Sequence, residues 1–525
     1  MEALQLIGLL VGSFAVTAVA RRSGISPPLL LVVVGLVASF VPGIPDYQLD
    51  PDLILLLILP PLLYSAALST SYLRIRDNIL PISLLAVGLV LVTTAAVGLV
   101  ASWLVTGLPL AAALALGAVV APPDAVAAAA VGRRLRLPRQ IMTILGGESL
   151  MNDASALTAY RVAVAVAGGA SYGILQGLGV FVLAAAGGVA IGWGLGRLVH
   201  RIRLALRDGE LESALGLIVP WVAYFLAERV HASGVLAVVM AGLYLGHRSP
   251  QAHPLARLQT RAVWQAADIL LESFVFALIG LQLRAVTDAV DSRIAQLALV
   301  GVVLMLAATV VRFAWVFPTA YLPRRLSRRV RDREPVAPPW RYPAVVSWAG
   351  MRGPVSLAAA AALPLTTESG APFPGRDEIV FLAFFFTVGT LLLQGATLPM
   401  VIRRLGVEGA EHYTDALAEA QAQTEAARAA EHRLNELDDG NPLHEHIVAT
   451  LRAGLESRTN AAWERLGGRS DDVTPSEAYR RMRREMLNAE REVFLRHRNE
   501  RRIDDEVFRR IQHELDLEEV MLDRE

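Results

Sequence analysis

The chain has 525 residues, of which 54% are hydrophobic and only 19% are charged, and its mean hydropathy is +0.45. A water-soluble protein of this length seldom reaches such values, so the composition indicates a membrane protein with many apolar segments. The absence of cysteine excludes disulfides, thiolate metal sites and cysteine nucleophiles. The net charge of zero averages an apolar part, which ends near residue 402, and a Glu/Arg/Ala-rich part that follows it.

Apolar runs of membrane-spanning length follow one another through the first four hundred residues. The first run is preceded by Glu2 and by no basic residues, so we expect a retained span and not a cleaved signal peptide. We expect thirteen helices, near residues 3–20, 27–43, 52–69, 79–106, 108–131, 140–167, 174–200, 210–229, 232–247, 263–284, 293–320, 342–364 and 378–402.

The distribution of arginine orients these helices. Arginine supplies all 49 basic charges, which together with abundant alanine and glycine is typical of a GC-rich bacterial genome. If the N-terminus lies outside, 22 arginines fall in the inner loops and four in the outer loops. The positive-inside rule therefore predicts an outer N-terminus and a cytoplasmic C-terminus in the bacterial plasma (inner) membrane.

The fifth predicted helix is interrupted near its middle by Pro122 and Pro123. Proline has no N–H group, so the carbonyls of Ala118 and Val119 lose their partners within the helix. Unpaired carbonyls at this depth must face protein, water or an ion. Asp124 follows the break and could serve that ion, although a proline kink with a backbone-bonded aspartate would explain the same residues.

The sixth predicted helix carries four polar side chains within two turns. Glu148 and Asn152 are four residues apart on one face, and Ser149 and Asp153 form the adjacent row. Charged groups at bilayer depth cost several kcal/mol, so two carboxylates here indicate a functional site more strongly than a structural polar cluster.

The twelfth predicted helix repeats the pattern of a weakened middle, with Gly350, Arg352, Gly353 and Pro354 in sequence. Helices 5 and 12 are seven spans apart, an odd number, so they run in opposite directions through the membrane. Two interrupted helices in inverted positions predict a transporter built from inverted repeats, with its site at the membrane midplane.

One further arginine lies deep in a predicted helix. Arg312, in the eleventh, needs an acidic partner, and Glu148 is the obvious candidate. Asp268 and Glu272 lie four residues apart near the inner end of the tenth helix, where a water-accessible polar face explains them about as well as function does. We find no nucleotide-binding loop and no metal-ligand spacing, so we expect no cofactor, no enzymatic activity and no nucleic-acid partner.

The sequence divides into a transmembrane domain, residues 1–404, and a cytoplasmic helical C-terminal domain, residues 405–525. In the tail, charges of both signs alternate with few apolar residues. A helix start is predicted at Thr474–Glu477, with proline in the first turn, and a break at residues 439–442.

Five segments together resemble the Na⁺/H⁺ exchangers of the first monovalent cation:proton antiporter family. They are PPDAVA (122–127), GGESLMND (146–153), SGVLAVVMAGLYLG (233–246), FVFALIGLQL (274–283) and GMRGPVSLAAA (350–360). The tail motif at 503–519 is similar to that of bacterial members. The resemblance implies an all-α inverted-repeat fold, a homodimer and an elevator-like motion.

The resemblance also implies roles for individual residues. Asp153 corresponds to the carboxylate that binds Na⁺ or a proton, with Asn152 beside it and Asp124 and Ser149 nearby. Glu148 corresponds to the glutamate that pairs with an arginine, here Arg312. Arg352 matches the family's helix 12 arginine, and it supports the helix crossing with Pro122, Pro123, Gly353 and Pro354. Many members have Thr-Asp-Pro where this chain has Pro123-Asp124-Ala125.

A carboxylate at bilayer depth can accept either a hard monovalent cation or a proton, which is what an exchanger requires. The sequence therefore predicts Na⁺/H⁺ antiport, and the single carboxylate of the Asn152-Asp153 pair predicts an electroneutral cycle. K⁺/H⁺ antiport is the alternative within transport. A cation channel or a membrane sensor acting through the tail are alternatives of another class, for which no filter loop or catalytic motif is present.

Overall fold

The structure is a computed structural model that describes residues 3–524 with several gaps. The gaps are residues 43, 45–50, 52, 170–173, 207, 327–336, 368–369, 408, 410, 439–441 and 468–473. Within the described residues the regular elements are helices, and the β-pairing is limited to one isolated bridge between Thr366 and Pro372. The expected all-helical class is confirmed.

The chain forms two compact units, Met1–Glu408 and Gly409–Glu525. The expected boundary at 404/405 lies four residues earlier, at the end of helix α19 (Arg376–Leu405). Gly406 terminates this helix in a left-handed conformation with φ of 59°, which glycine adopts without steric cost. Each unit is described separately below.

Seven helices of the described chain are long and apolar enough to cross a membrane. They are Gln5–Ser23, Ile79–Leu104, Gly179–Leu206, Gly209–Arg229, Pro254–Val290, Ile294–Arg325 and Arg376–Leu405. Shorter apolar helices lie at Pro27–Ala38, Leu53–Ser69 and Leu110–Val120. Each of the thirteen predicted ranges contains a helix, although the predicted ends at residues 43 and 52 fall outside the described residues.

The third and fourth predicted helices are less regular than expected. Each contains a π-helical segment, η1 (Leu53–Ile58) before α3 (Leu59–Ser69) and η2 (Leu84–Leu89) before α6 (Val90–Leu104). Two short helices, α4 (Tyr72–Asp77) and α5 (Ile79–Ser83), precede η2. The indole of Trp315 donates a 2.9 Å hydrogen bond to the Leu84 carbonyl, which satisfies one backbone group in the irregular stretch.

The fifth and twelfth predicted helices, expected to be interrupted near their middles, are each two helices separated by a short non-helical segment. The first pair is α7 (Leu110–Val120) and α8 (Ala125–Arg134), and the second is α17 (Arg341–Trp348) and α18 (Pro354–Ala361). Pro122 and Pro123 end the first helix because they cannot donate to it, whereas Pro354 starts α18 at a position where no N–H is needed.

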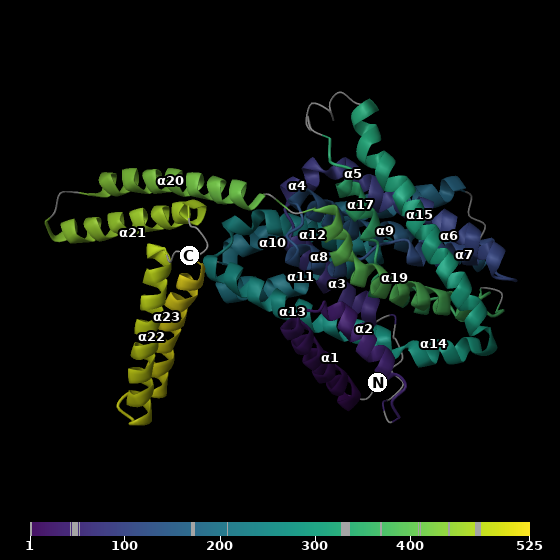
Figure 1. The fold of residues 1–525 in the computed structure, drawn as a ribbon, viewed down its shortest axis with the longest axis horizontal. Helices are drawn as coiled ribbons and strands as arrows, with labels where there is room; N and C mark the ends of the chain where they lie inside the picture. The colour runs from purple at the N-terminus through teal and green to yellow at the C-terminus, as the bar shows by residue number, and fades with distance from the viewer. Residues whose placement is uncertain are drawn as a thin grey trace. The chain divides into compact units, whose positions relative to one another are not determined.

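The remaining helices of the first unit are α1 (Ala3–Ser23), α2 (Pro27–Ala38), α9 (Arg139–Ala167), α10 (Ile174–Leu206), α11 (Gly209–Arg229), α12 (Gly234–Arg248), α13 (Pro254–Leu281), α14 (Leu283–Val290) and α15 (Ile294–Leu326). They are labelled in Figure 1. Small residues allow close packing between them. A Cβ atom placed on Gly35 of α2 would lie 2.9 Å from the Cα of Gly280 on α13, so glycine is required at this contact.

The apolar side chains of the first unit form two main clusters. One includes Leu116 on α7, Leu304 on α15 and Leu391 on α19. The other includes Tyr64 on α3 and Val238 on α12, together with side chains of α10 and α11. Helix α9 belongs to both clusters, so the polar side chains in its middle lie where the two clusters meet.

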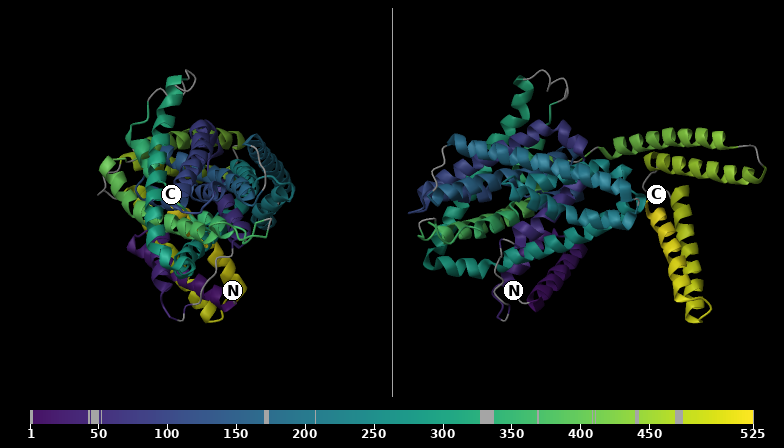
Figure 2. Two further views of the ribbon diagram at one scale, coloured as in Figure 1. Left: turned by 90° about the vertical axis from the view of Figure 1, so that its right-hand side faces the viewer. Right: turned by 180° about the vertical axis from the view of Figure 1, so that it is seen from behind.

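The described residues of the second unit form four helices, arranged as two hairpins. They are α20 (Glu411–Leu437), α21 (Pro442–Gly467), α22 (Pro475–Asn499) and α23 (Asp505–Arg524). The members of each hairpin lie side by side in the views of Figures 1 and 2. Helix α22 begins at the predicted position, where Thr474 and Glu477 form a capping box. The predicted break at 439–442 lies mostly outside the described residues.

An ion pair and a small apolar core join α22 to α23. Leu487, Leu515 and Leu522 are buried between the helices. The Arg483 guanidinium donates to Glu518 at 2.6 and 2.8 Å, and these hydrogen bonds hold the pKa of the Glu518 carboxyl below its usual value. The stabilisation from this pair is therefore present above the unfolded pKa of the carboxyl and is lost as pH falls through the folded pKa.

Candidate functional site

The two interrupted helices cross at their breaks. The backbone N–H of Asp124 donates a 2.7 Å hydrogen bond to the carbonyl of Met351, which joins the extended segment before α8 to the one before α18. Four helix ends lie at this crossing. The C-termini of α7 and α17 and the N-termini of α8 and α18 border the crossing, so partial charges of both signs meet in the interior.

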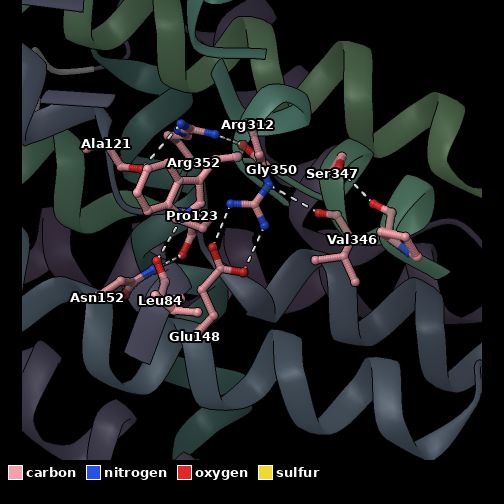
Figure 3. A network of polar contacts seen from close by, with 12 residues as sticks. Leu84, Ala121, Pro123, Glu148, Asn152, Arg312, Val346, Ser347, Gly350 and Arg352 are labelled. Atoms are coloured by element: carbon pink, nitrogen blue, oxygen red, sulfur yellow. Dashed lines mark hydrogen bonds and ion pairs between the residues drawn. The ribbon is translucent and has the colours of Figure 1, made fainter. Parts of the chain in front are cut away.

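A buried arginine occupies the C-terminal end of α7. The Arg352 guanidinium donates through Nε to the Val120 carbonyl at 2.7 Å and through Nη2 to the Ala121 carbonyl at 3.3 Å. A third N–H reaches the Gly350 carbonyl, and the guanidinium carbon lies 5.1 Å from the ring centre of Phe386. Arg352 therefore satisfies carbonyls of both breaks and places positive charge where α7 is negative (Figure 3).

A second buried arginine occupies the C-terminal end of α17. Arg312 donates from Nε to the Val346 carbonyl at 3.1 Å. Its Nη1 and Nη2 atoms donate to the two carboxylate oxygens of Glu148 at 2.6 and 2.8 Å (Figure 3). The two side chains are 3% and 1% exposed, so this bidentate pair ties α9 to α15 and α17 without water.

Asn152 connects α9 to the first break. Its side-chain amide donates a 2.7 Å hydrogen bond to the Pro123 carbonyl, and the residue is fully buried. The amide oxygen of Asn152 has no hydrogen-bond partner within the described residues. An acceptor atom is therefore left beside the crossing, next in sequence to Asp153.

Asp124 caps α8 with one carboxylate oxygen and leaves the other without a partner. Its Oδ1 atom accepts a 2.8 Å hydrogen bond from the N–H of Val126, while no described residue donates to the buried Oδ2 atom. Gly353 lies against this carboxylate, and a Cβ atom there would be 2.7 Å from the Asp124 Cγ. Glycine is therefore required for the two breaks to come this close.

Asp124, Asp153 and Ser149 line one cavity of about 620 Å³. Asp153 is 8% exposed, and the Asp124 carboxylate lies on the wall of the same cavity. Three arginines, Arg74, Arg133 and Arg139, lie on the wall of the same cavity.

On its other side Asp153 borders a cavity of only about 10 Å³, which also contacts Tyr160 and Ala359. That volume is about the minimum for a single water molecule. Asp153 therefore borders the large cavity on one side and a space of about one water molecule on the other.

The structure brings the predicted site residues together around the crossing: Asp124, Glu148, Ser149, Asn152, Asp153 and Arg312, with Pro122, Pro123, Arg352, Gly353 and Pro354 in or beside the breaks. The loss of helical partners at the Ala118 and Val119 carbonyls stays a prediction. The side-chain donors reach the carbonyls of Val120, Ala121 and Pro123, at the end of α7 and just after it.

Three polar contributors were not assigned from the sequence. Thr390 on α19 accepts a 3.1 Å hydrogen bond from the Arg352 backbone N–H, and a lone threonine in an apolar helix gives no signal of such a role. Asp268 and Glu272, left open between a polar face and a function, line the same cavity as Asp153. Asp268 accepts a 2.6 Å hydrogen bond from Ser65.

Comparison with known proteins gives the same picture over most of the chain. The family model described as "Sodium/hydrogen exchanger, transmembrane" matches residues 9–404. An uncharacterized Na⁺/H⁺ exchanger of Mycobacterium tuberculosis is 36% identical over 99% of this chain and 96% of its own length. An uncharacterized Na⁺/H⁺ exchanger of Escherichia coli is 31% identical over 94% of each chain.

A third relative, the sodium, potassium, lithium and rubidium/H⁺ antiporter of Bacillus subtilis, is 30% identical over 76% of this chain and 62% of its own length. Among solved structures, the sodium proton antiporter MjNhaP1 from Methanocaldococcus jannaschii superposes with a TM-score of 0.60 at 19% identity. The superposition covers 77% of this chain and 99% of that one, so the two proteins share a fold.

Breaking the buried Glu148–Arg312 pair should strongly destabilise the protein. Replacing either partner leaves an unpaired buried charge, so Glu148→Gln and Arg312→Gln should each lose roughly 3–5 kcal/mol of unfolding free energy. Because the double variant removes both charges, it should recover part of that loss. Thermal unfolding of the purified protein in detergent measures all three.

The exposed pair Arg161–Glu228, 2.9 Å apart and also anchored on α9, is the matched control. Its glutamine variants should change stability by no more than about 1 kcal/mol. Strictly additive losses at Glu148 and Arg312 would contradict the energetic coupling between them.

Proposed function

We propose that this protein exchanges Na⁺ for H⁺ at Asp153 and Asp124. The chain belongs to the sodium/hydrogen exchanger family, so it is a multi-pass membrane cation/proton antiporter and not an enzyme. The observation that carries the proposal is the position of these carboxylates, buried at the helix crossing and lining one large cavity. Ser149 on the cavity wall and the unpartnered amide oxygen of Asn152 supply further oxygen ligands, which hard cations prefer. Na⁺ and H⁺ are substrates here, and no cofactor is proposed.

Competition for Asp153 provides the exchange. A carboxylate that is shielded from water on one side cannot remain ionised and empty at low cost, so it holds either a cation or a proton. The cation displaces the proton when it binds, and the proton displaces the cation after the site has changed sides. The ion gradient supplies the energy, and the protein forms no covalent intermediate.

We propose an elevator-like motion as the way in which the site changes sides. The carboxylates lie where the two apolar clusters of the membrane unit meet, and the cavity walls come from both clusters. The crossing itself is held by hydrogen bonds from Arg352, Arg312 and Asn152 to carbonyls of α7, of α17 and of Pro123. These features support a rigid group of helices carrying the site past the others, a motion that would close the large cavity and open the small one.

The wider assignments are also part of the proposal. Residues 1–404 form the transport domain of about thirteen spans with inverted repeats, and residues 405–525 form a cytoplasmic helical domain. The arginine distribution supports an outer N-terminus and a cytoplasmic C-terminus in the bacterial plasma membrane. Family resemblance supports a homodimer.

K⁺ is the second candidate cation. The Bacillus subtilis relative is named for potassium as well as for sodium, lithium and rubidium. In this chain Pro123 replaces the threonine found before the aspartate in many family members, so a hydroxyl ligand is missing from the site. A site with fewer fixed ligands discriminates less between cations of different radius, and transport of K⁺ beside Na⁺ is compatible with it.

Asp153→Asn should abolish exchange without unfolding the protein, because the substitution removes the group that carries both ions and keeps its shape. The measurement is the pH change driven by Na⁺, K⁺ or Li⁺ in everted membrane vesicles, normalised to the amount of inserted protein. Asp124→Asn should reduce the rate as well. Asp268→Asn, the same chemical change in the same cavity, should keep a substantial part of it. Exchange by Asp153→Asn at a rate close to wild type would refute the assignment.

The cycle should be electroneutral. Asp153 carries one cation one way and one proton the other, while Asp124 stays ionised at the N-terminus of α8. A transferred charge feels about 2.3 kcal/mol per 100 mV. With balanced ion gradients in proteoliposomes, an imposed potential should therefore produce no net Na⁺ uptake. Potential-driven accumulation would show that a second proton moves.

A further inference from the structure

A second cavity of the membrane unit lies apart from the carboxylates. It has a volume of about 240 Å³ and is lined by residues of α4, α5, η2, α9, α15 and α17. Its wall is mainly apolar, with Leu85, Ile144, Val316, Ala320 and Val346 among its members. The volume falls somewhat below the roughly 300–1,000 Å³ of sites that enclose a small molecule. It is suited to part of a chain-like apolar ligand whose remainder lies outside.

The charged residues of this cavity gather where helices end. Arg324 lies in the last turn of α15, a helix of 33 residues, and Arg76 lies in the last turn of the short helix α4. The ends of long apolar helices mark the depth at which the membrane meets water. Tyr342 and Gln140 also line the cavity, and aromatic side chains with a polar tip favour that depth.

The cavity continues outward over apolar surface. Ile79 and Leu80 line it and are 45% and 44% exposed, so an apolar chain can pass over them between the cavity and the surrounding bilayer. The wall thus combines an apolar interior, an apolar exit and two guanidinium groups. Asp77 is the one acidic residue among the described lining residues, and its carboxylate lies 3.8 Å from Arg76. Both of these side chains are more than half exposed, so the pair is weak and solvated.

We propose that this cavity binds one anionic phospholipid, with an acyl chain among the apolar side chains and the phosphate at Arg76 and Arg324. A guanidinium group presents paired N–H donors that match phosphate oxygens, and basic pockets between membrane helices at the cytoplasmic side recognise anionic headgroups in this way. The ligand needs no separate supply, because a membrane protein is surrounded by lipid. The proposal does not depend on which cation is transported.

The lipid would contact the structure that holds the transport site. Val346 lines the cavity, and its carbonyl accepts the hydrogen bond from Arg312. Ile144 lies one turn before Glu148 on α9, and Val316 lies one turn after Arg312 on α15. The α4–α5 wall connects α3, in one apolar cluster, to η2, in the other. A bound acyl chain would therefore pack against α9 and α15, which carry the Glu148–Arg312 pair, and against the α4–α5 segment between the two apolar clusters.

Lipid binding can be measured on the purified full-length protein by native mass spectrometry, with phosphatidylglycerol and phosphatidylcholine of identical acyl chains. Wild-type protein should retain one phosphatidylglycerol per protomer at least tenfold more tightly than phosphatidylcholine. The double variant Arg76→Gln/Arg324→Gln should lose that preference, whereas Arg76→Lys/Arg324→Lys should keep part of it because the charge remains. Arg325→Gln, an exposed neighbour outside the cavity, is the matched control and should bind as wild type does.

A second variant tests the chain-binding part separately. Ala320→Phe places a ring in the cavity and should weaken retention of phosphatidylglycerol at least tenfold with both arginines intact. Thermal unfolding without added lipid shows whether each variant is folded. Asp77→Asn should tighten binding, since it removes the acidic competitor. Three results would each overturn the proposal. Wild type could retain the two lipids equally, or the folded Ala320→Phe and glutamine double variants could both retain phosphatidylglycerol as wild type does. Soluble glycerol phosphate could also bind as tightly as phosphatidylglycerol.

Discussion

Backbone groups that lose their helical partners inside an apolar bundle must find others, and the candidate site is arranged around this constraint. Pro122, Pro123 and Pro354 interrupt two helices within the apolar bundle. Each unsatisfied carbonyl or amide at such depth costs several kcal/mol. The structure satisfies them with the Asp124–Met351 backbone hydrogen bond and with two buried side chains, the guanidinium of Arg352 and the amide of Asn152.

The same arrangement balances charge. The two helix C-termini at the crossing carry partial negative charge and each is met by a buried arginine, Arg352 at α7 and Arg312 at α17. Arg312 is neutralised by Glu148, and Asp124 lies at the N-terminal end of α8, where partial positive charge favours a carboxylate. Among the described residues no hydrogen bond or ion pair is seen at Asp153, so we propose that this carboxylate is the one that exchanges partners. The structural charges of Arg352, Arg312 and Glu148 are thus distinct from the carboxylate of Asp153, which is proposed to bind the ions.

Much of this could be predicted from the sequence, because the strongest signals were local. Prolines and a carboxylate within an apolar run predict a broken helix with an ionisable group, and four polar side chains in two turns of α9 predict a site. The Glu148–Arg312 contact followed from the need of a deep charge for a partner.

Features that depend on how distant segments pack against one another could not be predicted from the sequence. The place where α7 ends, the carbonyls that Arg352 reaches and the support from Thr390 are fixed by the angle at which two segments 230 residues apart cross, which no local pattern encodes. The irregular stretch from α4 to η2 was missed for a similar reason, since its π-helical turn is satisfied by Trp315 from a distant helix.

The central claim is that one buried carboxylate, Asp153, holds either a cation or a proton. The most direct test is to add Na⁺ to the purified protein in weakly buffered detergent solution and to measure released protons with a pH dye, while calorimetry reports the cation bound. The account predicts about one proton released for each Na⁺ bound, and neither binding nor release at this site in Asp153→Asn. Na⁺ binding without proton release, or release that is unchanged in Asp153→Asn, would contradict it.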